Sequence, residues 1–221
     1  MSVSHRLVIF IALFITCLIT ANVIAVKVIS LGPFFLPAAI FVFPLSYIFG
    51  DILTEVYGYR LARRVIWLGF ICNLIFVFFV WLGQALPAAP FWEGQEAYQR
   101  ILGYTPRLLA ASFLGYLVGE FVNSFILARM KIMTRGRWLW SRTIGSTIVG
   151  QGLDTSIFIT VAFIGTPSFV PIMILYHWLA KTLIEALATP LTYVIVNFLK
   201  KKESIDTYDH DTRFNPFLIA K

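Results

Sequence analysis

Residues 65–82 read VIWLGFICNLIFVFFVWL, an unbroken run without a charged side chain. About 20 apolar residues in a helix cross the hydrocarbon core of a bilayer. Backbone in hydrocarbon must satisfy its own hydrogen bonds, which leaves only helices and closed barrels. Barrel strands alternate in hydropathy over about ten residues. This run shows no such alternation, so it predicts a transmembrane helix.

Similar runs occupy most of the chain. The expected spans are about 7–26, 36–57, 63–86, 107–129, 143–165 and 170–199. Hydrophobic residues make up 59% of the chain and charged residues 13%, where a soluble domain carries about 25% charge. We therefore predict an all-α polytopic membrane domain over residues 1–200. A polar tail over 201–221 is expected to be cytoplasmic and poorly ordered.

The net charge of +7 does not indicate nucleic-acid binding, because the basic residues lie in short clusters between apolar runs. Lys and Arg concentrate in cytoplasmic loops of membrane proteins. One side of the predicted bundle carries Arg6, Arg60, Arg63, Arg64, Arg129, Lys131, Arg135, Arg137, Arg142, Lys200, Lys201 and Lys202. The other side carries only Lys27, Arg100 and Arg107. This asymmetry predicts six spans with both termini in the cytoplasm.

No enzyme, cofactor or metal pattern is present in the sequence. Cys17 and Cys72 lie inside apolar runs and are interpreted as small core side chains. There is no P-loop, HExxH zinc helix or nucleophile elbow. The chain is therefore not expected to use ATP through a P-loop or to be an enzyme.

Two connections differ from ordinary loops. Residues 31–37 are apolar but interrupted by Gly and Pro, which predicts an extended or re-entrant piece. Residues 87–105 include Trp92, Glu93, Glu96, Tyr98 and Tyr104. They fit either an interfacial amphipathic segment with aromatic anchors or a plain outer loop.

Ionisable residues inside spans are costly and mark candidate functional sites. Asp51 and Glu55 are four residues apart, so both carboxylates share one helix face. Two like charges repel in low dielectric, so either one carboxylate holds a proton or both require a cationic partner. The alternative is structural, with Glu55 at the cytoplasmic interface paired to Arg60 or Arg63.

Span 143–165 carries the clearest polar stripe. Gln151, Asp154 and Thr155 recur at helical spacing with Thr147. This face is expected to line a solute site, or else to form a structural hydrogen-bond cluster between helices. Lys181, in the last span, is expected to pair with Asp154 or Asp51.

Other spans add polar groups. Glu120 and Asn123 follow Gly115 and Gly119, whose spacing permits close helix approach. Asn22 lies at the end of the first span. These side chains are expected to complete a polar cluster built from several helices.

Several stretches together resemble the queuosine precursor transporter family, formerly grouped as vitamin uptake transporters. They are ANVIAVK (21–27), FPLSYIFGDILTEVYG (43–58), YRLARRVIW (59–67), GQGLDT (150–155) and HWLAK (177–181). The run DILTEVYG is the most specific of them. The resemblance covers about residues 7–200.

The resemblance implies an importer of 7-deazaguanine bases, cyano or aminomethyl, in a bacterial inner membrane. It also implies a fold related to the substrate-binding subunits of energy-coupling-factor transporters, working without their ATPase. A carboxylate can accept from both donors of a guanine-like edge, and Asp154 or Asp51 is favoured for this. Whichever of Asp154 and Asp51 does not bind this edge, or else Glu55, would bind an aminomethyl cation. Asn22, Asn123, Gln151 or Lys181 would serve the acceptors of the base.

Other functions remain open from the sequence. The chain could be a binding subunit that needs an ATPase partner, or a carrier for another nucleobase- or vitamin-like solute. A membrane enzyme or a structural membrane protein is a further alternative. Transport could be proton-coupled or facilitated. For a homodimer, the face of Gly115 and Gly119 is a candidate contact, with packing inside the bundle as the alternative.

Overall fold

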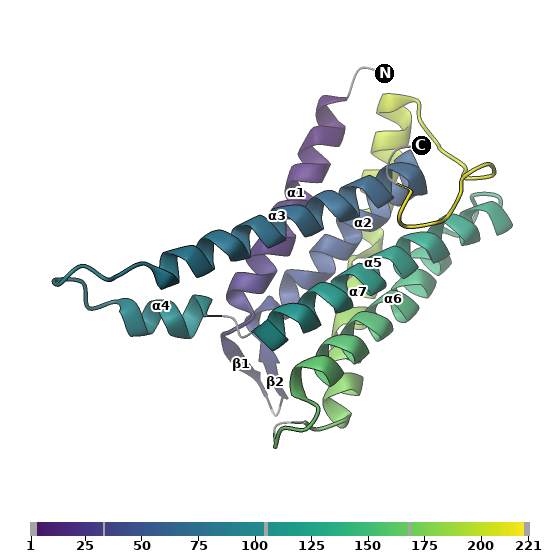
Figure 1. Ribbon diagram of the computed structural model, residues 1–221. Helices are drawn as coiled ribbons and strands as arrows, with labels where there is room; N and C mark the ends of the chain where they lie inside the picture. Colours follow the sequence, from purple (N-terminus) through teal and green to yellow (C-terminus); the bar gives the residue numbers. More distant parts are fainter. Residues whose placement is uncertain (1–3, 33, 104–105, 168, 219–221) are drawn as a thin grey trace.

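The computed structural model describes residues 4–32, 34–103, 106–167 and 169–218, and within them six helices are long and apolar enough to cross a bilayer (Figure 1). These helices are α1 (His5–Ile24), α2 (Phe43–Tyr57), α3 (Tyr59–Ala85), α5 (Pro106–Met133), α6 (Leu139–Phe163) and α7 (Ile172–Glu203). The all-α polytopic architecture expected from the sequence is confirmed.

Helix α2 begins at Phe43, later than the expected span start at 36. The preceding residues form a hairpin of β1 (Val28–Leu31) and β2 (Phe34–Pro37), followed by the 3₁₀ turn η1 (Ala38–Phe41). The strands are antiparallel, with Val28 opposite Pro37. The ladder satisfies backbone groups of this interrupted stretch. The expected extended or re-entrant piece is therefore a β-hairpin.

The connection between α3 and α5 contains a short helix, α4 (Gln95–Leu102). Its Glu96 and Arg100 form an exposed ion pair one turn apart. Tyr98 donates to the backbone carbonyl of Val80, which attaches α4 to α3. Tyr104, one of the expected aromatic anchors, lies outside the described residues, and residues 95–102 of the segment are helical. Their depth in the membrane stays a prediction.

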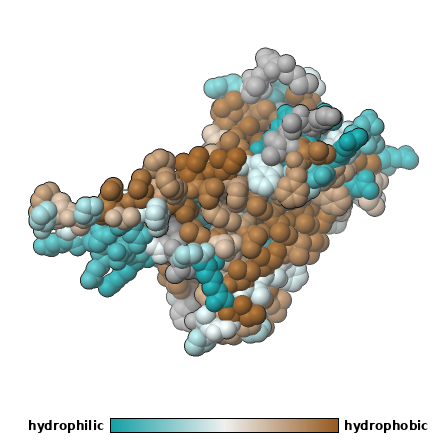
Figure 2. All heavy atoms as spheres, in the orientation of Figure 1, coloured by the Kyte–Doolittle hydropathy of each residue, from teal (hydrophilic) through white to brown (hydrophobic). Residues whose placement is uncertain are grey.

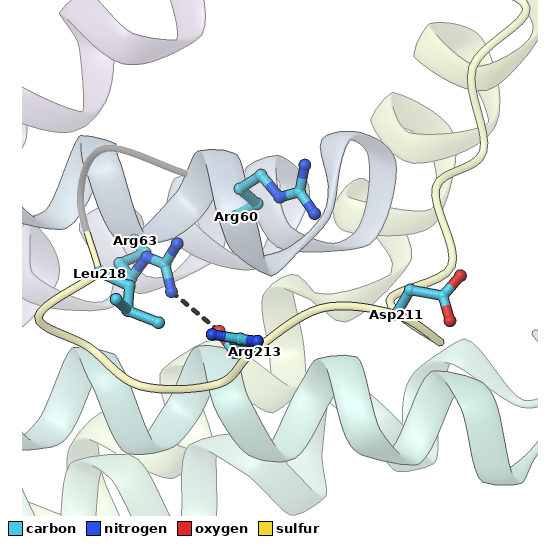
Figure 3. Close-up of a pocket in the computed structure, with 5 residues that line it drawn as sticks. All are labelled: Arg60, Arg63, Asp211, Arg213 and Leu218. Carbon is cyan, nitrogen blue, oxygen red and sulfur yellow. Dashed lines mark hydrogen bonds between the residues drawn. The ribbon is translucent and has the colours of Figure 1, made fainter.

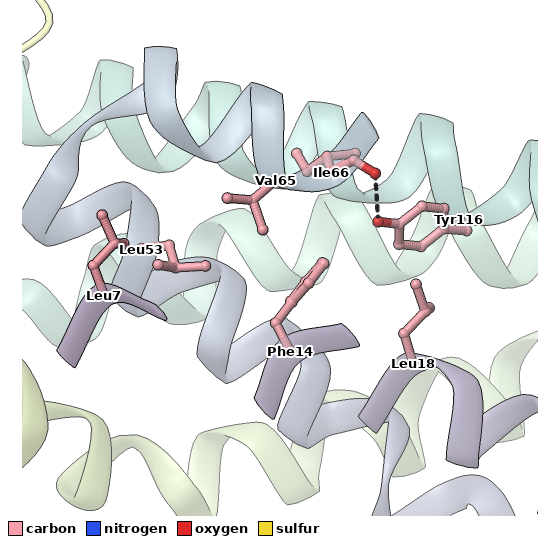
Figure 4. Close-up of a cluster of buried hydrophobic side chains, with 7 residues drawn as sticks. All are labelled: Leu7, Phe14, Leu18, Leu53, Val65, Ile66 and Tyr116. Carbon is pink, nitrogen blue, oxygen red and sulfur yellow. Dashed lines mark hydrogen bonds between the residues drawn. The ribbon is translucent and has the colours of Figure 1, made fainter. Parts of the chain in front are cut away.

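Helix α2 is the central element of the bundle. It contacts α1, α3, α5 and α7, and most of its residues are buried. On one side an apolar cluster joins it to α1, α3 and α5 (Figure 4). In that cluster the Tyr116 hydroxyl donates to the backbone carbonyl of Ile66 at 3.0 Å. Asp51 and Glu55 of α2 make their contacts with polar side chains of α5, α6 and α7.

The outer surface matches a membrane environment. Figure 2 shows hydrophobic residues spread over the body of the helices, with hydrophilic residues gathered toward the ends. Large apolar side chains such as Phe79, Trp81 and Leu187 are more than half exposed. Exposed apolar surface on this scale is stable in lipid and not in water.

The C-terminal segment (residues 204–218) differs from the expected poorly ordered tail. It returns from the end of α7 and packs against α2, α3 and α5 (Figure 1). Asp209 is only 4% exposed, and the Trp67 indole donates to the Pro216 carbonyl at 2.8 Å. The polar composition that suggested disorder instead provides groups for hydrogen bonds to helix ends.

Candidate functional site

A polar core lies between α2, α5, α6 and α7, with every member less than 9% exposed. It consists of Tyr47, Asp51, Glu120, Asn123, Thr147, Gln151, Asp154, Thr155, Lys181 and Glu185. Side chains of this kind are expensive in a membrane unless they have partners or a function. Most of the core is inaccessible to solvent, and Asp154 and Lys181 are its most exposed members at 8% each.

Glycines let α5 and α6 approach closely and so position the core. A Cβ on Gly150 would lie 2.7 Å from the Asn123 Cβ and 3.0 Å from the Gly119 carbonyl. A Cβ on Gly115 would lie 2.8 Å from Asp154 Oδ1. The Gly115 and Gly119 face is therefore a contact inside the bundle. It is not available as the homodimer contact that the sequence left open.

Asp51 is connected to α5 across the core. The Asn123 amide nitrogen donates to Asp51 Oδ1 at 2.7 Å. Two of the residues predicted from separate spans are thus in direct contact. The bond fixes the orientation of the Asn123 amide, whose oxygen has no hydrogen-bond partner within the described residues.

Lys181 pairs with Asp154, as the sequence predicted. The Lys181 ammonium lies 2.8 Å from Asp154 Oδ2 and 3.4 Å from the Thr155 hydroxyl. It also lies 4.8 Å from the centre of the Phe43 ring, a favourable cation–π distance. One positive charge is therefore fixed between α6 and α7.

Several other core groups have no partner among the described residues. Both carboxylate oxygens of Glu120 and the Tyr47 hydroxyl make no hydrogen bond there. Glu185 accepts from the Thr147 hydroxyl through one oxygen, and its other oxygen has no partner. An unsatisfied buried polar group costs about 1–3 kcal/mol. Partners that entered the core would therefore lower this cost.

The core contains more acids than bases. Four carboxyl groups, from Asp51, Glu120, Asp154 and Glu185, surround the single ammonium of Lys181 among the described core residues. Like charges in low dielectric cannot all stay ionised without a counter-charge. Protons or a cationic solute would provide that neutralisation.

Two predicted site residues lie apart from this core. Glu55 is one turn beyond Asp51 and is held by Arg142 at 2.8 Å and Lys200 at 2.7 Å. It has these partners in place of Arg60 or Arg63, which the sequence suggested. Asn22 is half-buried near the end of α1 and accepts from the Ser112 hydroxyl at 3.3 Å.

Sequence reasoning did not select two members of the core, Tyr47 and Glu185. Both carried a signal, because Tyr47 is one turn before Asp51 and Glu185 is one turn after Lys181. Helical spacing alone would have placed them on the same faces as the chosen residues.

Comparison with known proteins gives consistent matches. The family described as "Putative vitamin uptake transporter" matches residues 37–195. The "Probable queuosine precursor transporter" of Bacillus subtilis (strain 168) is 33% identical over 158 residues, covering 69% of this chain and 68% of that protein. The "Queuosine precursor transporter" of Escherichia coli (strain K12) is 24% identical over 208 residues, covering 90% of each. No solved structure matches the chain.

Proposed function

This chain belongs to the putative vitamin uptake transporter family, and we propose on that premise that it imports queuosine precursors across a bacterial inner membrane. The observation that carries the proposal is a buried polar core inside a bundle of apolar helices, with groups that have no partner among the described residues. A solute that enters such a core can satisfy groups that the protein leaves without partners.

The proposed substrates are 7-deazaguanine bases with a cyano or aminomethyl group. Their guanine-like edge has two adjacent donors, N1–H and the exocyclic amine, which one carboxylate can accept together. The sequence favoured Asp51 or Asp154 for this edge. Glu120 fits better. Asp154 is paired with Lys181 and Asp51 with Asn123, whereas both Glu120 oxygens have no hydrogen-bond partner among the described residues.

The remaining polar groups suit the other atoms of the base. The Gln151 amide is fully buried in the core and carries both a donor and an acceptor, which suits the carbonyl side of the ring system. An aminomethyl cation would be neutralised by Glu185 or Asp51. The rings of Phe43 and Tyr47 border the core, and stacking on an aromatic ring contributes about 1–3 kcal/mol per base.

The proposed orientation has both termini in the cytoplasm. The Lys and Arg asymmetry of the loops supports it. The Glu55 cluster and the C-terminal segment then lie at the cytoplasmic end, and the β-hairpin and α4 lie outside. We also propose that the fold is related to that of the binding subunits of energy-coupling-factor transporters.

Uptake in cells tests the function. The host would lack its own queuosine synthesis and its own importer, and would receive nanomolar cyano- or aminomethyl-deazaguanine. Queuosine in tRNA should appear only with this protein, and Asp51→Ala and Asp154→Ala should each abolish it. Thr16→Val, an exposed change on α1, is the matched control and should be silent. Absence of queuosine with the protein present in the membrane, or normal uptake with both aspartates replaced, would contradict the proposal.

A further inference from the structure

The C-terminal segment binds the junction between α2 and α3. Thr207 donates its amide to the Val56 carbonyl at 3.2 Å, and Asp209 accepts from the Tyr59 amide at 2.9 Å. The Asp209 carboxylate thereby caps the first turn of α3, where an anion is favoured. Arg63 then donates to the Arg213 carbonyl at 2.9 Å (Figure 3). It also donates to the Asn215 carbonyl at 2.7 Å.

The same segment binds the end of α5 and the loop to α6. The Lys131 ammonium donates to Asp206 at 2.6 Å and to the Thr207 carbonyl at 2.8 Å. The Tyr208 ring lies 4.7 Å from that ammonium. Further along, the Phe214 and Phe125 rings are 5.2 Å apart. The segment therefore connects the α2–α3 hairpin to the α5–α6 hairpin.

A glycine makes room for the segment in each of the two connections. Gly58 has φ +87°, and a Cβ there would lie 2.7 Å from the Thr207 methyl carbon. Gly136 has φ +75°, and a Cβ there would overlap the Tyr208 hydroxyl. Positive φ already favours glycine at both places. The contacts add a second reason, since a larger residue would displace the segment.

Beneath the segment, a buried ion cluster joins the ends of four helices. Glu55 of α2 meets Arg142 of α6 and Lys200 of α7, with Lys131 of α5 at 3.6 Å. Asp206 adds a second carboxylate, 2.6 Å from Lys131 and 2.9 Å from Lys200. Without the segment, three cations would share Glu55 alone, and their repulsion would loosen the cluster.

This cluster lies between the polar core and one end of the bundle. Lys131 is eight residues beyond Asn123 on α5, about 12 Å along the helix axis at 1.5 Å per residue. Lys131 and Arg142 are at most 2% exposed. A solute in the core could leave toward this end only if the cluster and the segment above it separate.

We propose that the C-terminal segment is a latch that holds this end of the bundle closed and undocks when the core opens there. The role of the latch in transport rests on the proposed function. Its closure can be measured without any substrate.

Thiol accessibility tests the latch. In a Cys17→Ala, Cys72→Ala background, Ser146→Cys places one thiol at a buried position one turn beyond Arg142. Inverted vesicles would be exposed to a membrane-impermeant maleimide. Asp206→Asn with Asp209→Asn should raise the labelling rate at least about tenfold, because the loss of even one charge-assisted hydrogen bond has an effect of this size. Asp211→Asn, on an exposed residue of the same segment, should leave it unchanged.

An unchanged rate in the folded double variant would overturn the latch, as would rapid labelling with the segment intact. If the double variant fails to fold, Phe125→Cys and Phe214→Cys in the cysteine-free background replace it. Joining these thiols with a cleavable linker should stop uptake while leaving base binding intact, and cleavage should restore uptake. Uptake at the unlinked rate while linked would overturn the latch. Absence of base uptake in every variant would count against the proposed function, and the maleimide result would still decide the latch.

Discussion

At the scale of single residues, the pairing of Lys181 with Asp154 determines how the core tolerates its charges. Removing one partner of a buried pair leaves an uncompensated charge and costs about 3–5 kcal/mol. Lys181→Met should therefore lower the thermal unfolding midpoint clearly. Lys181→Met combined with Asp154→Leu should recover most of the loss, because a buried pair can be replaced by apolar groups. Equal destabilisation by the single and double variants would show that the pair is not the cause.

Asp206 makes docking of the C-terminal segment sensitive to acid. Partial burial raises its pKa, but hydrogen bonds and charge attraction from Lys131 and Lys200 outweigh this, so the pKa lies below its ordinary value of 3.8. A depressed folded pKa stabilises the docked state fully above the unfolded value, and the stabilisation disappears as the pH falls through the folded value. Docking should consequently be insensitive to pH near neutrality.

The difference in unfolding midpoint between the unaltered protein and Asp206→Asn measures this contribution. The difference should be constant from about pH 7 to 5 and shrink below about pH 4, where the carboxylate takes up its proton. A difference that already changes near pH 6 would assign the effect to another group.

At the scale of elements, the close contact of α5 and α6 positions the core. Gly150→Ala introduces a Cβ 2.7 Å from the Asn123 Cβ and 3.0 Å from a backbone carbonyl. Neither neighbour is the flexible end of a side chain, so the helices must separate. Strain of this kind costs about 1–3 kcal/mol and should also reduce uptake, because Asn123 orients Asp51.

Gly152→Ala on the same helix is the matched control. Its Cβ would meet the Trp178 indole nitrogen at 3.4 Å, an ordinary contact. Gly150→Ala should lower the thermal unfolding midpoint and the uptake rate clearly more than Gly152→Ala does. Equal tolerance of the two changes would mean that α5 and α6 can move apart without consequence.

At the scale of the whole molecule, the proposed orientation predicts which loops lie outside. A phosphatase that is active only outside the cytoplasm should be active when fused after Gly165, between α6 and α7, and inactive when fused after Lys202. The reason is the excess of Lys and Arg at the opposite end. A fluorescent protein that matures only in the cytoplasm should give the reverse pattern, and agreement of the two reporters at either position would contradict the orientation.

Much of the fold follows from the sequence because the bilayer restricts the alternatives. The runs around residues 65–82 and 143–165 have the length and hydropathy of spanning helices, and the structure contains them. The hairpin at 28–37 and the docked C-terminal segment are harder to predict from the sequence. The hairpin pairs residues that are close in sequence, but its strands are as apolar as the spans beside them. The C-terminal segment depends on contacts distant in sequence, such as Asp209 with Tyr59, which no local pattern encodes.

Part of the candidate site can also be predicted from the sequence, and part of it cannot. Lys181 with Asp154 and Asp51 with Asn123 could be anticipated, since a buried charge in a span requires a partner. Glu55 was grouped with the site because it shares a face with Asp51, but it belongs to the ion cluster at the helix ends. Glu55 lies closer to the end of the helix than Asp51. Helical periodicity shows which face a residue is on, but not how far along the span it lies.

Equilibrium binding of a labelled 7-deazaguanine base to the purified protein tests the central claim most directly. The unaltered protein and Thr16→Val should bind it saturably. Glu120→Gln, which keeps the shape of the side chain and removes its charge, should weaken binding about 10- to 100-fold, as expected for the loss of charge-assisted hydrogen bonds. Unchanged affinity in a folded Glu120→Gln protein would contradict the assignment of Glu120, and absence of binding to the unaltered protein would contradict the proposed substrate.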